Sequence, residues 1–121
     1  MSKILIVDDE DFIRDMMKDF LEFEGYEFFE AENGENAFKL IDEKKDEISL
    51  IFLDYTLPDI KGNEFVKKML EKGIKIPVIL TSGLSDNLVL SEDEKQVVKA
   101  TLSKPFNLDN FLKILKDITG S

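Results

Sequence analysis

The sequence of 121 residues contains no cysteine and no histidine, and these two absences exclude several kinds of site. Without cysteine the chain has neither a disulfide framework nor a thiolate metal site. Without histidine it lacks the usual zinc ligand and the usual general base of an enzyme. Any metal bound by this chain is therefore expected to have oxygen ligands.

The sequence also lacks long apolar stretches. No apolar run approaches the roughly 18 residues that are needed to span a membrane. Residues 1–3 lead straight into a strand-like stretch, with no sign of a signal peptide. We therefore expect a soluble protein of the cytoplasm, with no membrane insertion.

Positive charge is scarce, because 26 acidic residues face 16 basic ones and the net charge is −10. Such a charge opposes direct binding to nucleic acid, which needs cations to replace the condensed counterions. The imbalance lies in residues 1–60, which hold 18 acids and 6 bases, whereas residues 61–121 hold 8 acids and 10 bases. A solvated acidic face on the first two helices explains this distribution. A docking role for the less acidic second half is the alternative.

What the sequence does contain is a regular alternation of two apolar patterns. Short apolar stretches alternate with stretches in which apolar residues recur every three or four positions. Five strands alternating with five helices require right-handed crossovers and a parallel sheet with helices on both faces. We therefore predict one domain over residues 1–121 with an α/β, doubly wound fold. The predicted strands are residues 3–7, 26–31, 48–54, 76–82 and 99–103.

Several residues predict where the helices begin and end. Gly25 is expected to end the first helix, and Asn107 to cap the last one. Residues 91–94 have the capping-box form Ser-x-x-Glu, which predicts a short helix through Val97 and Val98. The first helix is predicted to turn an apolar stripe inward, made of Phe12, Ile13, Met16, Met17, Phe20, Leu21 and Phe23.

Acidic side chains follow two of the predicted strands. Asp8 and Asp9 follow the first strand, and Asp54 ends the third. In a doubly wound sheet the strand C-termini share one edge, so these carboxylates converge if the two strands are neighbours. A divalent cation would relieve their repulsion, and an all-oxygen ligand set favours Mg²⁺. Asp8 to Asp11 are also explained by an N-cap and an acidic first turn, and the two interpretations can coexist.

Two further strand ends supply groups that suit a phosphoryl group. Ser82 ends the fourth strand with a hydroxyl, and Lys104 follows the fifth strand with an ammonium. Taken alone, Ser82 is explained as a hydroxyl in a turn and Lys104 as a lysine at the surface. Together with a metal site and a carboxylate nucleophile they form an arrangement for phosphoryl transfer, in which Asp54 becomes an acyl phosphate.

Four motifs occur in order along the chain: Ile6 to Glu10, Leu53 to Pro58 with Gly62, Pro77 to Gly83, and Lys104 to Phe106. Together they resemble the receiver domains of two-component response regulators, and in particular the single-domain chemotaxis receivers. The resemblance covers the whole chain. It implies a flavodoxin-like three-layer fold with strand order 2-1-3-4-5.

The resemblance also implies a role for each acidic residue of the site. Asp54 would accept a phosphoryl group from the phosphohistidine of a histidine kinase or phosphotransfer protein. Asp9, Asp54 and the backbone carbonyl of Thr56 would bind Mg²⁺, and Asp8 would act mostly through water.

For the remaining site residues the resemblance implies contacts with the phosphoryl group. Ser82 would donate a hydrogen bond to it and Lys104 would pair with it. We align the hydroxyl position of the family with Ser82 rather than Thr81, because Ser82 precedes a small residue and lies 22 residues before Lys104.

One position departs from the family pattern. Three residues before the lysine the family usually has tyrosine or phenylalanine, a ring that swings inward on activation, and this chain has Thr101. Either Thr101 couples by a smaller movement or the output surface is recognised differently. The positions of Thr56 and Leu84 vary in the family and are expected to tune the lifetime of the phosphoryl group.

The function predicted from the sequence is therefore a phosphorylation-activated switch rather than an enzyme. Its output is expected to come from an unidentified partner at the face formed by the fourth helix, fifth strand and fifth helix. A Mg²⁺-dependent aspartyl-phosphate phosphohydrolase is one alternative, although Thr56 stands where such enzymes carry a second aspartate. A flavodoxin-like electron carrier is disfavoured by the acids after the first strand, which would repel a flavin phosphate. A degenerate receiver that only scaffolds partners is the last alternative.

Overall fold

The computed structural model describes residues 2–83 and 88–120, and its centre is a sheet of five parallel strands. The strand order is β2-β1-β3-β4-β5, so the chain first winds outward from β1 to one edge and then returns to wind toward the other. This arrangement confirms the predicted α/β, doubly wound fold. The strands are β1 (Lys3–Val7), β2 (Glu27–Ala31), β3 (Ile48–Asp54), β4 (Val78–Ser82) and β5 (Val98–Ser103).

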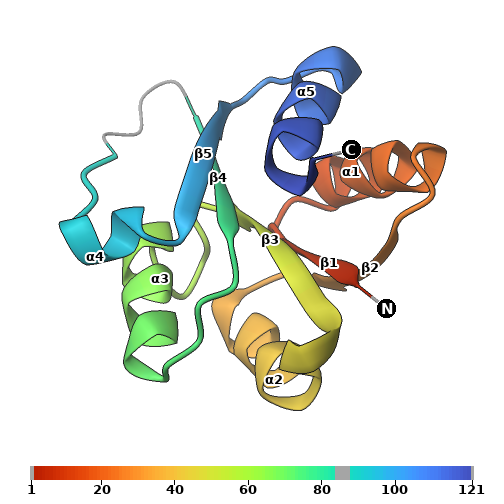
Figure 1. Ribbon diagram of the computed structural model, residues 1–121. Helices are drawn as coiled ribbons and strands as arrows, with labels where there is room; N and C mark the ends of the chain where they lie inside the picture. Colours follow the sequence, from red (N-terminus) through yellow and green to blue (C-terminus); the bar gives the residue numbers. More distant parts are fainter. Residues whose placement is uncertain (1, 84–87, 121) are drawn as a thin grey trace.

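Helices cover both faces of this sheet, which gives three layers (Figure 1). On one face α1 and α5 lie side by side, and on the other face lie α2 and α3, with α4 packed beside α3. Among the described residues no helix has the length and apolar character of a membrane span. The helices are α1 (Asp11–Phe23), α2 (Gly34–Lys44), α3 (Gly62–Glu71), α4 (Glu92–Lys95) and α5 (Leu108–Thr119), and a 3₁₀ turn (Lys45–Glu47) precedes β3.

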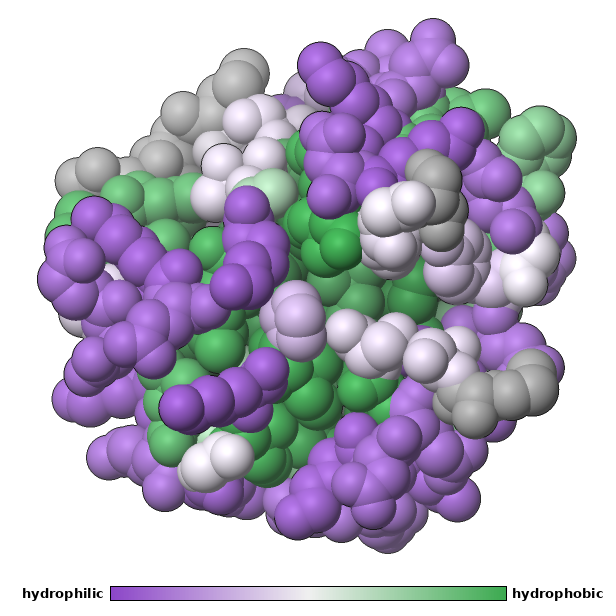
Figure 2. Space-filling view, in the orientation of Figure 1, coloured by the Kyte–Doolittle hydropathy of each residue, from purple (hydrophilic) through white to green (hydrophobic). Residues whose placement is uncertain are grey.

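The central strand β3 is buried on both faces, as expected for a parallel strand covered by two helix layers. Leu50 and Phe52 face α1 and α5, whereas Ile51 and Leu53 face α2 and α3. Because β3 ends on Asp54, the packing of this central strand also fixes the position of the carboxylate. Figure 2 shows apolar residues in the middle of the face drawn there, bordered by hydrophilic ones, and further apolar residues toward its left and upper right edges.

The two edges of the sheet are more exposed than its centre. The edge strand β2 exposes Glu27 and Glu30, which agrees with its partly alternating pattern. The other edge strand, β5, exposes Lys99, Thr101 and Ser103 and buries Leu102.

The prediction for the buried stripe of α1 was wrong at both of its ends. Met17 and Leu21 are fully buried, but Phe12 and Phe23 are 76% and 73% exposed. At 3.6 residues per turn, Phe12 and Phe23 both lie about 120° to 140° around the helix from Met17, which turns them away from the sheet.

The prediction for α4 was wrong in its length. Its capping box at Ser91 and Glu94 is present, but the helix ends at Lys95 and Val98 already belongs to β5. The backbone N–H of Val78 donates to the carbonyl of Val97 at 2.8 Å, so the chain leaves the helix in order to pair with β4. The predicted ends at Gly25 and Asn107 are confirmed, with Gly25 at φ +80° and the side chain of Asn107 accepting from the N–H of Asn110.

The loop between β3 and α3 is fastened to the start of α2 by the side chain of Asp59. Its Oδ1 accepts from the N–H of Gly34 and its Oδ2 from the N–H of Glu35, each at 2.9 Å. Both donors belong to the first turn of a helix, where N–H groups have no partner within the helix. Asp59 therefore caps α2 from a distant part of the chain and at the same time fixes the loop that follows Asp54.

We expect Asp59→Ala to lower the free energy of unfolding by about 1 to 2 kcal/mol, since a lost cap costs this much. Asp59→Asn keeps one acceptor oxygen and is expected to lose less. Urea unfolding followed by circular dichroism measures both variants. Equal stability of Asp59→Ala and the parent protein would show that this contact does not contribute.

Candidate functional site

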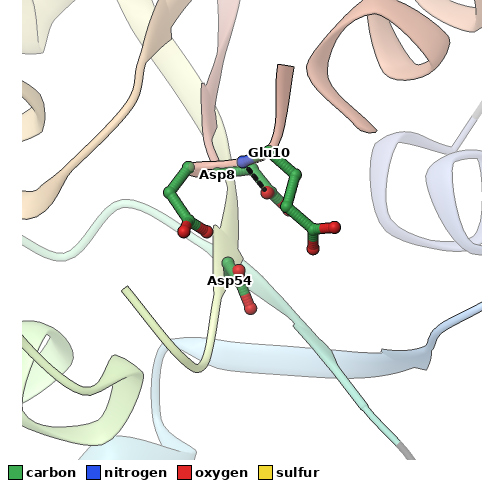
Figure 3. A group of neighbouring side chains, drawn as sticks. Asp8, Glu10 and Asp54 are labelled. Atoms are coloured by element: carbon green, nitrogen blue, oxygen red, sulfur yellow. Dashed lines mark hydrogen bonds between the residues drawn. The ribbon is translucent and has the colours of Figure 1, made fainter. Parts of the chain in front are cut away.

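The candidate site lies where β1 and β3, which are neighbours in the sheet, both end. Asp8 follows β1 and Asp54 ends β3, and both side chains are buried. Asp8, Asp9, Glu10 and Asp54 each offer a carboxylate oxygen, and these four oxygens all lie within 4.8 Å of one another. Figure 3 shows the side chains of Asp8, Glu10 and Asp54 gathered at these strand ends. The structure therefore brings together the three aspartates that the sequence predicts, and adds Glu10.

Backbone amides hold the two buried carboxylates in place. The N–H of Glu10 donates to Asp8 Oδ1 at 2.9 Å, a bond drawn in Figure 3, and the N–H of Thr56 donates to Asp54 Oδ1 at 3.1 Å. The N–H of Asp8 in turn donates to the carbonyl of Ala31 at 3.1 Å, which continues the pairing of β1 with β2. Each buried carboxylate thus has one oxygen fixed by the backbone of its own loop.

Lys104 supplies the positive charge of the site. Its Nζ lies 3.0 Å from Asp8 Oδ2, 3.2 Å from Asp54 Oδ2 and 3.1 Å from Glu10 Oε1. The N–H of Lys104 donates to the carbonyl of Ser82 at 2.7 Å, and the Lys104–Pro105 peptide bond is cis. Lys104 therefore reaches across the ends of β4 and β5 to the carboxylates at the ends of β1 and β3.

Burial and neighbouring charges shift the pKa values of these groups. Burial first, and the charge of Asp8 second, raise the pKa of Asp54 from its ordinary value of 3.8 to about 6, although the Thr56 amide and Lys104 act in the opposite direction. Burial also raises the pKa of Asp8. Burial alone would lower the pKa of Lys104, but the hydrogen bond to Asp8 and the charges of Asp8 and Asp54 raise it. The site therefore favours a bound cation when its carboxylates are ionised.

A shallow cavity of about 300 Å³ opens above these carboxylates. A divalent cation with oxygen ligands suits this place, because the described ligand atoms are all carboxylate oxygens that lie close together. Lys104 is a single charge among them. The donor set therefore fits Mg²⁺ in the way expected from the sequence. The residues lining the cavity are Asp9, Glu10, Asp54, Thr56, Gly83 and Lys104.

The two adjacent hydroxyls at the end of β4 differ in their surroundings. Ser82 lies in register with Ser103, is 5% exposed and precedes Gly83, which lines the cavity. Thr81 lies in register with Asp54, and its Oγ1 is buried without a hydrogen-bond partner in the structure. Thr81 is therefore a second buried hydroxyl near the site. The sequence favours Ser82 over Thr81 for the contact with the phosphoryl group.

Thr101 lies outside this cluster. It is exposed on the edge strand β5, in register with Leu80 of β4. The structure thus places Thr101 at the surface that was expected to carry the output. Leu84, which was expected to tune the lifetime of the phosphoryl group, lies outside the described residues.

Sequence reasoning missed Glu10 as a partner of Lys104. The acidic run Asp8 to Asp11 was the available signal, but an exposed acid at the start of a helix is already explained by the helix dipole. The contact between Lys104 and Glu10 joins residues 94 positions apart, and only the folded chain reveals it.

Comparison with known proteins shows the family to which the chain is similar. The model of the response regulator receiver domain matches residues 4–116. The chemotaxis protein CheY of Listeria monocytogenes is 35% identical over 117 residues, which is 96% of this chain and 97% of the relative. Sporulation initiation phosphotransferase F of Bacillus subtilis is 30% identical over 95% of this chain and 91% of its own length.

Solved structures agree on the architecture. The receiver domain of NtrX from Brucella abortus has a TM-score of 0.84 at 25% identity and covers 98% of this chain and 99% of its own. A CheY-like receiver domain protein from Methanospirillum hungatei has a TM-score of 0.87 over 98% of this chain and 94% of its own. At 18% identity the second comparison supports the fold alone.

Proposed function

The chain belongs to the response regulator receiver domain family of two-component signalling, and from this premise we propose that it is a switch activated by phosphorylation of Asp54. Receiver domains are signalling switches rather than classical enzymes. The observation that carries the proposal is the environment of Asp54, a buried carboxylate at the end of the central strand that contacts Lys104 and lies beside three other acids.

The proposed step transfers a phosphoryl group to Asp54. A carboxylate oxygen of Asp54 forms a bond to phosphorus while the bond from phosphorus to the imidazole nitrogen of a phosphohistidine breaks. The electron pair of that bond stays with the imidazole, which takes up a proton, and Asp54 becomes an acyl phosphate. The donor is a sensor histidine kinase or a phosphotransfer protein. With an acyl phosphate as a small donor, the bond from phosphorus to oxygen breaks instead and a carboxylate leaves.

The residues around Asp54 divide the remaining tasks. Asp8, Asp9, Asp54 and the backbone carbonyl of Thr56 would hold Mg²⁺, with Asp8 acting mostly through water. When bound, Mg²⁺ supplies positive charge for the oxygens of the transferred group. The N–H of Thr56 keeps Asp54 Oδ1 oriented, since it already donates to that oxygen.

Lys104 and Ser82 complete the proposed site. Lys104 moves from the carboxylates to an oxygen of the phosphoryl group. Its Nζ lies 3.2 Å from Asp54 Oδ2, which supports this role. Ser82 donates its hydroxyl proton to another oxygen of the same group. Charge and hydrogen bonding at the end of β4 and β5 thereby change when Asp54 is phosphorylated.

Output is proposed to come from a partner that binds the face of α4, β5 and α5 in the cytoplasm. The partner must prefer one state of Asp54, because a partner with equal affinity for both states would report nothing. Thr101 lies on this face and is exposed, so we assign it to the output surface rather than to the chemistry. Residues 1–121 act as one receiver domain in this proposal.

The test of this proposal is the intact mass of the protein after incubation with acetyl phosphate and Mg²⁺. We expect the parent protein to gain one phosphoryl group, because Asp54 is a carboxylate held next to a cation and a metal site. Asp54→Asn is expected to gain none. Asp9→Asn keeps Asp54 but removes a proposed Mg²⁺ ligand, and is expected to be labelled far more slowly.

Asp42→Asn is the matched control, since Asp42 is an exposed aspartate on α2 that pairs with Lys72. It is expected to be labelled like the parent protein. A parent protein without an adduct would refute the proposed switch. An adduct that persists in Asp54→Asn would move the acceptor to another residue.

A further inference from the structure

Arg14 is the only arginine in a chain with fifteen lysines, and its side chain is 12% exposed. It projects from the first turns of α1. Its Nη1 donates to the backbone carbonyl of Asp8 at 2.6 Å, and its Nε donates to Glu30 Oε1 at 3.2 Å. Its Nη2 donates to Asp11 Oδ1. One guanidinium thus joins the end of β1, the end of β2 and the start of α1.

The three acceptors around this side chain suit an arginine better than a lysine. A guanidinium presents several N–H groups in a fixed plane, whereas an ammonium is a compact point charge on a flexible stem. Lys18, one turn further along α1, shows the difference. Its Nζ lies 3.0 Å from a carboxylate oxygen of Glu30 and 3.2 Å from one of Asp15. Lys18 and Arg14 therefore share the Glu30 carboxylate, and it is Arg14 that also donates to the Asp8 carbonyl.

The contact with Asp8 fixes the peptide unit between Asp8 and Asp9. That unit is planar, so a carbonyl held toward α1 also sets the direction in which the chain continues to Asp9. The N–H of Asp8 is already bonded to the carbonyl of Ala31, and the N–H of Arg14 to the carbonyl of Glu10. The short loop between β1 and α1 is thereby fastened on both sides of the two aspartates.

We propose that Arg14 is a positioning residue for the cation site, and that it presents Asp8 and Asp9 by holding the peptide unit between them. This inference rests on the proposed function, since the site is the one assigned there to Mg²⁺. Arg14 itself touches neither the cation nor the phosphoryl group. Its effect passes through the loop, as is usual for groups that orient metal ligands.

The competing explanation is that Arg14 only stabilises the fold through its ion pairs with Asp11 and Glu30. The two explanations differ for Arg14→Lys, which keeps the charge and the helix but loses the planar set of donors. A purely stabilising ion pair would be largely kept by lysine. A positioning contact with the Asp8 carbonyl would be lost.

The experiment measures Mg²⁺ affinity by isothermal titration calorimetry with MgCl₂, and stability by urea unfolding in EDTA, for the parent protein and three variants. We expect Arg14→Lys to weaken Mg²⁺ binding about tenfold, the lower end of the range for groups that orient metal ligands. Lys18→Met is expected to change it less than about twofold, because an exposed ion pair has little effect. Glu30→Gln removes the charge of one acceptor of Arg14 but leaves the Asp8 carbonyl, and is expected to weaken Mg²⁺ binding to an intermediate degree.

The outcomes separate this inference from the proposed function. Absence of Mg²⁺ binding in the parent protein would overturn both. Parent binding with unchanged affinity in Arg14→Lys would overturn the inference alone, whatever the change in stability. If Arg14→Lys does not fold, Glu30→Gln decides, and an affinity equal to that of Lys18→Met would overturn the role of Arg14.

Discussion

Replacement of Lys104 by methionine is expected to lower the free energy of unfolding of the metal-free protein by about 2 to 4 kcal/mol at pH 7, as when one partner of a buried ion pair is removed. Lys104 is 16% exposed, and its partners Asp8 and Asp54 are 0% and 5% exposed at their side chains. Methionine has a similar length but no charge, so both carboxylates would lose their nearest cation. Proton uptake by Asp54, whose pKa is already about 6, limits the loss.

Saturating Mg²⁺ is expected to restore most of the stability lost in Lys104→Met. A bound divalent cation would supply the charge that the ammonium no longer provides, and ligand binding to the folded state alone stabilises it. Urea unfolding in EDTA and in MgCl₂ measures both effects. Lys18→Met is the control, because its partners Asp15 and Glu30 are 71% and 39% exposed. A loss no larger than that of Lys18→Met, or one that Mg²⁺ does not reduce, would contradict this account of the site.

Replacement of Asp54 by asparagine is expected to make the metal-free protein more stable at pH 7, by about 2 to 3 kcal/mol. The pKa of Asp54 in the folded protein is about 6, and its ordinary value is 3.8. Each pKa unit corresponds to about 1.4 kcal/mol of differential stability between the two protonation states. The ionised carboxylate therefore opposes folding, and the neutral amide of asparagine does not.

The sign of the effect predicts its dependence on pH. Between pH 4 and 6 the folded protein binds more protons at Asp54 than the unfolded chain does, so the parent protein loses stability as the pH rises through this window. The advantage of Asp54→Asn is expected to be near zero at about pH 4 and complete above about pH 7, by the same linkage. Urea unfolding in EDTA at a series of pH values measures the difference between the two proteins.

The control for this series is Asp42→Asn, which removes an exposed carboxylate on α2. It is expected to change stability by less than about 0.5 kcal/mol at every pH, since surface ion pairs contribute little. An Asp54→Asn protein that is less stable than the parent, or whose advantage does not vary with pH, would contradict the electrostatic description of Asp54. Addition of Mg²⁺ is expected to reverse the order of stability, because the asparagine variant has lost a ligand.

Much of the fold was predictable because the three inner strands are short, apolar and followed by polar or turn-forming residues. The alternation of two periodicities was sufficient for the doubly wound sheet, whereas the strand order came from the resemblance to a family. The wrong predictions concern residues whose burial or secondary structure depends on contacts between elements. Phe12 and Phe23 are apolar and lie near the buried stripe of α1. Only the packing of α1 on the sheet shows that their side chains face solvent instead of the core. Val98 could continue a helix, and the pairing of β5 with β4 places it in a strand.

For the site, the sequence was informative about residues that follow strands and uninformative about those that act from elsewhere. Asp8, Asp9 and Asp54 could be predicted to converge because parallel strands end at one edge. The contacts of Arg14 with the Asp8 carbonyl and of Asp59 with α2 could not, since they join a side chain to backbone atoms of another element. Such contacts leave no periodic signal, and a lone arginine among lysines was the single clue to Arg14.

The exposed edge strand β5 has a consequence for the kind of recognition that this face permits. Edge strands present unpaired backbone groups to which another chain can add a strand, and charged or polar side chains along the edge discourage that addition. The edge strand β5 exposes Lys99, Thr101 and Ser103, and the opposite edge strand β2 exposes Glu27 and Glu30. A partner at β5 is therefore expected to recognise side chains rather than extend the sheet, and the same side chains disfavour the joining of two copies edge to edge into a continuous sheet.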